Sequence, residues 1–203
     1  VENLLHQLRI VRARGDDALI DLSQKFDAID LAMTGIRVTS AEIKQAVAAC
    51  SAVTLDALKF ARERINDHHE RQIPADDMYR DMAGVELGHR WTAVESVGLY
   101  VPGGLASYPS SVLMNAVPAK VAGVPEVIMV APTPGGEINP HVLAAARLSG
   151  VDRIFRIGGA QAVAALAYGT ATIPKVDKIT GPGNIYVATA KKLVFGQVGI
   201  DMI

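Results

Sequence analysis

The chain has 203 residues; half are hydrophobic and a fifth are charged, which is typical of a globular protein rather than of a disordered chain. The formal net charge of −1, without any cluster of Lys and Arg, argues against nucleic acid as a partner. Pro, Gly or a charged residue interrupts each apolar stretch before it reaches the roughly 20 residues of a membrane span. The single cysteine, Cys50, fits a reducing compartment. We therefore expect a cytoplasmic protein that binds neither nucleic acid nor a membrane.

The charges divide the chain into two regions. Residues 1–90 carry 27 charged side chains, whereas residues 91–203 carry only 14. The first region has helical spacing, and the second is apolar and punctuated by Gly and Pro. We expect an N-terminal helical segment over 1–90 and an α/β domain over 91–203.

Apolar residues at helical spacing predict several helices in the first region. Thr39 and Glu42 have the separation of a capping box, which predicts that a helix begins there and continues to Cys50. Residues 85–91 alternate apolar and polar, as a half-buried strand or a hairpin does. A further helix is expected over 54–70, with five residues on its buried side: Leu55, Leu58, Phe60, Ala61 and Ile65.

The second region alternates strands with helices, which predicts a parallel, doubly wound, Rossmann-like sheet covered on both faces. Because its strands run one way, the turns that follow them should gather at their carboxyl ends, where ligands bind in such sheets. Residues 198–203 resemble the start of another strand, so we expect an incomplete sheet from a longer polypeptide. The expected strands are 94–101, 127–131, 154–157 and 178–180, and the expected helices are 110–122, 141–149, 160–168 and 185–195.

Three glycine-rich turns are the strongest candidate ligand site. They occupy residues 100–104, 157–161 and 180–184, each between a strand and a helix. Glycine lets a ligand approach the backbone closely, and the N-terminus of the following helix attracts phosphate. None of them matches a dinucleotide-binding fingerprint or a P-loop. Each alone could be an ordinary turn, but three at one edge of a sheet favour a ligand site.

Other chemistry-bearing residues have structural explanations. His68 and His69 point about 100° apart on a helix and cannot chelate one metal together. Cys50 follows a run of small residues, which favours a buried, unreactive thiol. Lys191-Lys192 near a helix C-terminus complements the helix dipole. Trp91 is expected in the core or at an interface.

The second region resembles histidinol dehydrogenases. The resemblance is carried by residues 96–104, 109–124, 151–195 and 200–202, and it is looser over the N-terminal helices. It includes the turns YVPGG, GGAQ and GPGN, which are the turns selected above. The loop 133–139 is longer than in the family, and we expect it to be a surface connection.

The resemblance implies a zinc- and NAD-dependent oxidoreductase of histidine biosynthesis. Such enzymes oxidise L-histidinol to L-histidine through L-histidinal, in two hydride transfers to NAD, and they act as homodimers. The family's NAD contacts correspond to Tyr100, Gln161 and Asn184 in this sequence.

The family's zinc ligands, substrate contacts and catalytic base all lie beyond residue 203. No catalytic residue or metal ligand is therefore assigned here, and we expect the chain alone to be inactive. Two alternatives stay open. One is a nonenzymatic α/β ligand-binding module, and the other is an oxidoreductase of the same fold that acts on another amino alcohol.

Overall fold

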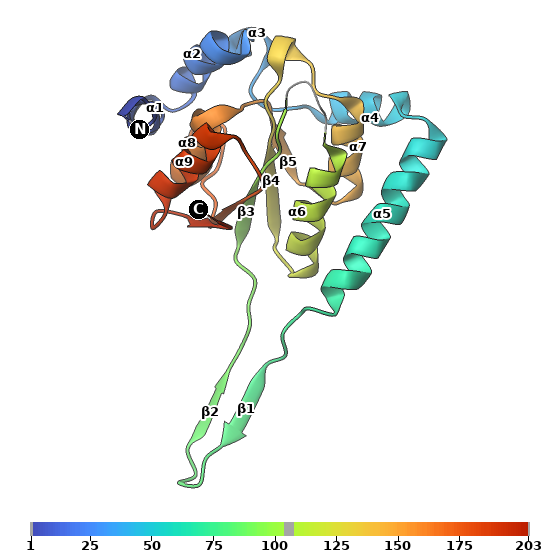
Figure 1. Ribbon diagram of the computed structural model, residues 1–203, viewed down its shortest axis with the longest axis vertical. Helices are drawn as coiled ribbons and strands as arrows, with labels where there is room; N and C mark the ends of the chain where they lie inside the picture. The colour runs from blue at the N-terminus through green and yellow to red at the C-terminus, as the bar shows by residue number, and fades with distance from the viewer. Residues whose placement is uncertain (1, 104–107, 203) are drawn as a thin grey trace.

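The computed structural model describes residues 2–103 and 108–202, and its centre is a five-stranded parallel sheet (Figure 1). The strand order is β5-β4-β3-β6-β7, so the predicted parallel, doubly wound sheet after a helical segment is confirmed. The strands are β3 (Ser96–Tyr100), β4 (Glu126–Val130), β5 (Arg153–Phe155), β6 (Lys178–Thr180) and β7 (Gly199–Ile200).

Helices cover both faces of this sheet. Helices α1, α2, α8 and α9 pack around one buried cluster, and α4, α5, α6 and α7 pack around the other. The helices are α1 (Glu2–Arg14), α2 (Asp16–Asp27), α3 (Leu31–Thr34), α4 (Ser40–Ala49), α5 (Ala52–Glu70), α6 (Pro109–Val121), α7 (Pro140–Leu148), α8 (Gly159–Tyr168) and α9 (Ile185–Val194), with a 3₁₀ turn, η1, at Pro134–Gly136.

Alternation along β3 divides its side chains between the two cores. Val97 and Leu99 belong to the cluster under α6 and α7, whereas Tyr100 belongs to the cluster under α8. A Cβ atom on Gly98 would lie 2.8 Å from Leu166 Cδ1. Glycine is therefore needed at this position because α8 packs directly against the middle of the sheet.

The connections define where a ligand can enter. Helices α6 and α7 lie on one face and α8 and α9 on the other, so the chain changes face after β5. Strands β3 and β6 are neighbours although they are far apart in sequence. Their carboxyl ends form the switch point, where open α/β sheets bind ligands.

The N-terminal segment packs against the sheet through both cores. Its capping box is confirmed: the Thr39 N–H donates to Glu42 Oε2 at 2.8 Å, and the Glu42 N–H donates to Thr39 Oγ1. The second carboxylate oxygen of Glu42 accepts a hydrogen bond of 2.6 Å from Arg156, the residue that directly follows β5. The division into 1–90 and 91–203 stays a prediction.

The hairpin predicted around 85–91 exists, but the expectation that it is half-buried is wrong. Strand β2 (Glu86–His89) pairs with β1 (Asp77–Arg80), which the sequence pattern did not reveal, and all eight residues are exposed. We call residues 76–91 the arm; it extends away from the sheet and its helices (Figure 1).

Two aromatic side chains expected in buried positions are exposed. Phe60 lies two positions beyond Leu58 on α5, about 200° around the helix, and it faces solvent next to Arg64. Trp91 ends the arm and does not belong to either core. The expectation that Phe60 faces the buried side is thus wrong, whereas a position for Trp91 at an interface stays a prediction.

Candidate functional site

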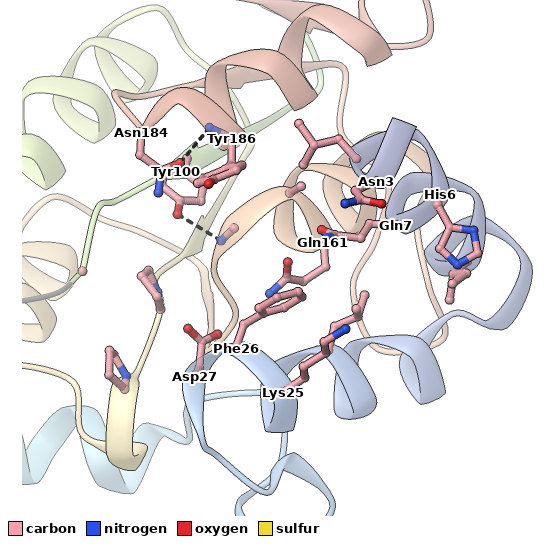
Figure 2. A pocket seen from close by; sticks show the side chains of 18 residues that line it. Asn3, His6, Gln7, Lys25, Phe26, Asp27, Tyr100, Gln161, Asn184 and Tyr186 are labelled. Carbon is pink, nitrogen blue, oxygen red and sulfur yellow. Dashed lines mark hydrogen bonds between the residues drawn. The ribbon is translucent and has the colours of Figure 1, made fainter. Parts of the chain in front are cut away.

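A cavity of about 820 Å³ opens at the carboxyl ends of β3, β4 and β6 (Figure 2). The three residues singled out from the sequence, Tyr100, Gln161 and Asn184, all line it. Segments from three widely separated parts of the chain therefore meet at the switch point. The turn at 100–104 is described only up to Gly103; its last residue and the following three lie outside the described residues.

Tyr100 ends β3 and joins the first turn to the second. Its side chain is only 4% exposed, and its hydroxyl accepts a hydrogen bond of 3.1 Å from the Gly159 N–H. Burial raises the pKa of Tyr100, and the nearby charge of Asp27 adds to that increase. The hydroxyl therefore stays protonated near neutral pH, with its own proton available to a ligand.

Gln161 lies in the first turn of α8 and is 2% exposed. Its amide lines the cavity and forms no hydrogen bond with another described residue. The amide is therefore open to the cavity, where it can bind a polar ligand. Gly159 has φ +64°, and a Cβ there would lie 2.7 Å from Gln161 Oε1. Glycine thus leaves the space that this amide occupies.

Asn184 is the N-cap of α9. Its Oδ1 accepts from the N–H groups of Tyr186 and Val187, at 3.0 and 3.1 Å. Capping therefore uses the side-chain oxygen, whereas the amide nitrogen remains as a donor at the cavity edge. Figure 2 shows Asn184 and Tyr186 beside Tyr100, on the opposite side of Gln161 from the α2 residues.

Close backbone contacts hold the three turns together. A Cβ on Gly181, which has φ +113°, would overlap the Tyr100 carbonyl oxygen. A Cβ on Gly158 or Gly103 would overlap Pro132, which follows β4. The glycines are therefore required by contacts between turns as well as by access for a ligand.

An ion pair between Lys191 and Asp201 supports the third turn. Lys191 is 3% exposed; its ammonium donates to the Gly181 carbonyl at 3.1 Å and pairs with Asp201. Asp201 in turn accepts from the Gly181 N–H at 2.8 Å. Lys191 lies in the last turn of α9, as expected for a residue that complements the helix dipole, and it also binds the third turn. Lys191 lies four residues after Val187, on the buried face of α9, and this spacing could have revealed it.

The N-terminal helices supply a wall that the sequence analysis did not assign. Figure 2 shows residues of α1 and α2 facing the strand ends across the cavity. Amphipathic spacing predicted these helices but not what they face, because that depends on tertiary packing. The lining residues from this segment are Asn3, Leu4, His6, Gln7, Ile10, Leu22, Lys25, Phe26 and Asp27.

The loop 133–139 is more than the surface connection that was expected. Thr133 is completely buried, and Pro134 lines the cavity together with Pro132. The loop closes one side of the cavity after β4.

Residues 2–103 and 108–202 offer neither a metal-binding cluster nor a membrane-spanning helix. These residues contain no group of three or more His, Cys, Asp or Glu side chains placed to hold a metal ion. Within the same ranges, the helices are too short or too polar to cross a bilayer.

The site thus combines glycine turns, a helix N-terminus without a capping side chain, and a buried amide facing open space. Its volume lies within the usual 300–1,000 Å³ or so of small-molecule and cofactor pockets. These features define a Rossmann-like α/β domain with a ligand cavity at its switch point.

The comparisons with known proteins identify the family. The chain matches the histidinol dehydrogenase family model over residues 2–203, and it belongs to that family. It is 67% identical over 193 residues to the histidinol dehydrogenases of Brucella abortus (strain 2308) and Rhizobium meliloti (strain 1021). These alignments cover 95% of this chain but only 45% and 44% of the relatives, so the chain spans less than half of their length.

A solved structure supports the same assignment. The crystal structure of histidinol dehydrogenase from Elizabethkingia anophelis superposes with a TM-score of 0.95 at 37% identity. The match covers 99% of this chain and 46% of that one. The resemblance noted from the sequence is therefore confirmed.

Proposed function

We propose that this chain is the NAD-binding part of a histidinol dehydrogenase. The complete enzyme would be an oxidoreductase of histidine biosynthesis that converts L-histidinol to L-histidine through L-histidinal, using NAD in two hydride transfers. The observation that carries the NAD assignment is the amide of Gln161, which faces the cavity and is not hydrogen-bonded to another described residue. Membership of the histidinol dehydrogenase family supports the oxidation of histidinol as the reaction of the complete enzyme.

The residues fit a dinucleotide. The N-terminus of α8 offers backbone N–H groups and the positive end of a helix dipole to a pyrophosphate. Gln161 can both donate to and accept from the cofactor, whereas Asn184 keeps its amide nitrogen as a donor. Tyr100 holds the Gly159 N–H and so fixes the start of α8. Bound NAD would supply the hydride acceptor, and this chain would position it.

Zinc is expected in the complete enzyme, but the described residues offer no site for it. The resemblance to the family implies that the zinc ligands, the substrate contacts and the catalytic base lie beyond residue 203, so none is assigned to this chain. For the same reason we expect the 203-residue chain alone not to oxidise histidinol. The homodimer and the cytoplasmic location also stay predictions.

Titration calorimetry with NAD tests the proposal on the full-length protein, beside an assay of histidinol-dependent NADH formation. We expect saturable NAD binding and turnover with L-histidinol. Binding without turnover of any amino alcohol would favour a nonenzymatic module. Turnover only with a different amino alcohol would support an oxidoreductase but exclude L-histidinol as its substrate. Failure to bind NAD would overturn the proposal.

A further inference from the structure

Asp27 is the only acidic side chain among the described residues that line the cavity. It ends α2 and is half-buried, and burial raises the pKa of its carboxyl group. It forms no hydrogen bond or ion pair with another described residue. A desolvated carboxylate without a protein partner suggests a ligand that donates hydrogen bonds to it.

The position of Asp27 narrows what this ligand group can be. Its charge lies close enough to Tyr100 to affect the pKa of that phenol. The chain just after α2 also approaches the loop after β4, because a Cβ on Gly136 would lie 3.9 Å from Ile29 Cδ1. The segment that carries Asp27 thus approaches the loop that follows β4, and Asp27 lines the same cavity as Pro132 and Pro134 of that connection.

Rossmann-type sites usually carry an acid after the second strand, where it binds the 2′-hydroxyl of the adenosine ribose. Here the second strand of the sheet is β4, and it is followed by Ala131, Pro132 and Thr133, none of which is charged. The usual position therefore lacks its acid, whereas the carboxylate of Asp27, from α2, lines the same cavity.

We propose that Asp27 replaces that acid: it accepts hydrogen bonds from the vicinal hydroxyls of the adenosine ribose and so selects NAD over NADP. A 2′-phosphate would remove one donor and place a negative charge against the carboxylate. This inference rests on the proposed NAD function.

The neighbouring charges agree with a ribose rather than a phosphate at Asp27. The pyrophosphate would lie at the N-terminus of α8, which offers backbone N–H groups and has no capping side chain. The cationic neighbour, Lys25, is exposed and lies with its ammonium 5.3 Å from the centre of the Phe26 ring. Lys25 would attract a phosphate whether or not Asp27 is present, so the variants must change Asp27 alone.

The test measures NAD and NADP affinities of the full-length protein by calorimetry, for the wild type, Asp27→Asn and Asp17→Asn. Asp17 is the matched control because it lies on α2, is exposed and does not line the cavity. We expect Asp27→Asn to weaken NAD binding about tenfold without weakening NADP binding. Asp17→Asn should match the wild type. Thermal unfolding of each variant checks that the fold is retained.

A second ligand makes the contact specific. NAD that lacks the adenosine 2′-hydroxyl should bind the wild type about tenfold more weakly than NAD, but Asp27→Asn should bind both ligands almost equally. An unchanged preference for NAD over NADP in Asp27→Asn, or an equal effect of Asp17→Asn, would overturn the ribose assignment while leaving NAD binding intact. Absence of NAD binding to the wild type would instead overturn the proposed function, and this inference with it.

Discussion

Every residue of β3 is buried, whereas every residue of β1 and β2 is exposed, although only residues 90–95 separate β2 from β3. Strand β3 pairs with two parallel neighbours and lies between two helical layers. The arm pairs only with itself, and a two-stranded hairpin alone is at best marginally stable in water. The strand ends therefore form a rigid base for a ligand, and the arm does not.

Polar interactions differ between the two regions in the same way. At the strand ends, the buried Lys191 pairs with the partly exposed Asp201, and both bind the backbone of Gly181. In the arm, Arg80 and Glu86 are exposed and 4.0 Å apart. Loss of one partner should therefore cost more stability at the first site, where Lys191 is buried, than at the second site, where both partners are exposed.

Breaking these two ion pairs should give the largest contrast. Lys191→Ala leaves the Gly181 carbonyl and the partly exposed Asp201 without their cation, and we expect the free energy of unfolding to fall by about 2–4 kcal/mol, less than for a fully buried pair. Arg80→Ala should change it by less than about 0.5 kcal/mol. Urea denaturation of both variants measures the difference. Similar losses would show that Lys191 is not buried in solution.

Adding a methyl group to one glycine in each region should give the next largest difference. Both Gly181 and Gly84 have positive φ, but a Cβ at Gly181 overlaps Tyr100, whereas a Cβ at Gly84 has no described atom within 4 Å. We expect Gly181→Ala to cost about 2–4 kcal/mol of unfolding free energy, and Gly84→Ala about 1 kcal/mol from backbone strain alone. Equal costs, measured by denaturation, would contradict the close contact between the first and third turns.

Removing the Gln161 amide should affect the ligand more than the fold. In the full-length protein, Gln161→Ala should weaken NAD binding by roughly 1–3 kcal/mol, because a buried hydrogen-bonding partner is lost. The arm variant Tyr79→Ala should bind NAD like the wild type, since Tyr79 lies outside the cavity. Calorimetric titration of both variants makes the comparison. Unchanged affinity in Gln161→Ala would exclude this residue from the cofactor site.

The same contrast explains which features could be predicted from the sequence. The strands and helices of residues 91–203 were placed to within a few residues because buried parallel strands read as apolar runs ended by glycine turns. The gathering of Tyr100, Gln161 and Asn184 at one cavity followed from that topology. Local pattern is informative where local structure and burial agree.

Prediction failed where long-range packing decides. Strand β1 has the sequence DMYR, which does not alternate, and its exposure gives no pattern to detect. The approach of Asp27 to Tyr100 joins positions 73 residues apart in sequence, and no local signal marks it. Thr133 belongs to a loop that was expected to be a surface connection, but the residue is fully buried.

The smallest expected effect concerns stability in acid, and it again separates the strand ends from the arm. Burial acts to raise the pKa of Asp201, but hydrogen bonds from Lys191 and the Gly181 N–H outweigh it and leave that pKa below its usual value. A carboxyl group whose pKa is lower in the folded state contributes stability above its unfolded pKa, and this contribution is lost as the pH falls through the folded value.

The free energy of unfolding of the wild type should therefore decline as the pH is lowered below about 4. Lys191→Met should show a shallower decline because Asp201 loses its main stabilising partner, whereas Arg80→Ala should keep the wild-type slope. Denaturation at a series of pH values measures these slopes, and identical slopes in all three proteins would contradict the role of the Lys191–Asp201 pair.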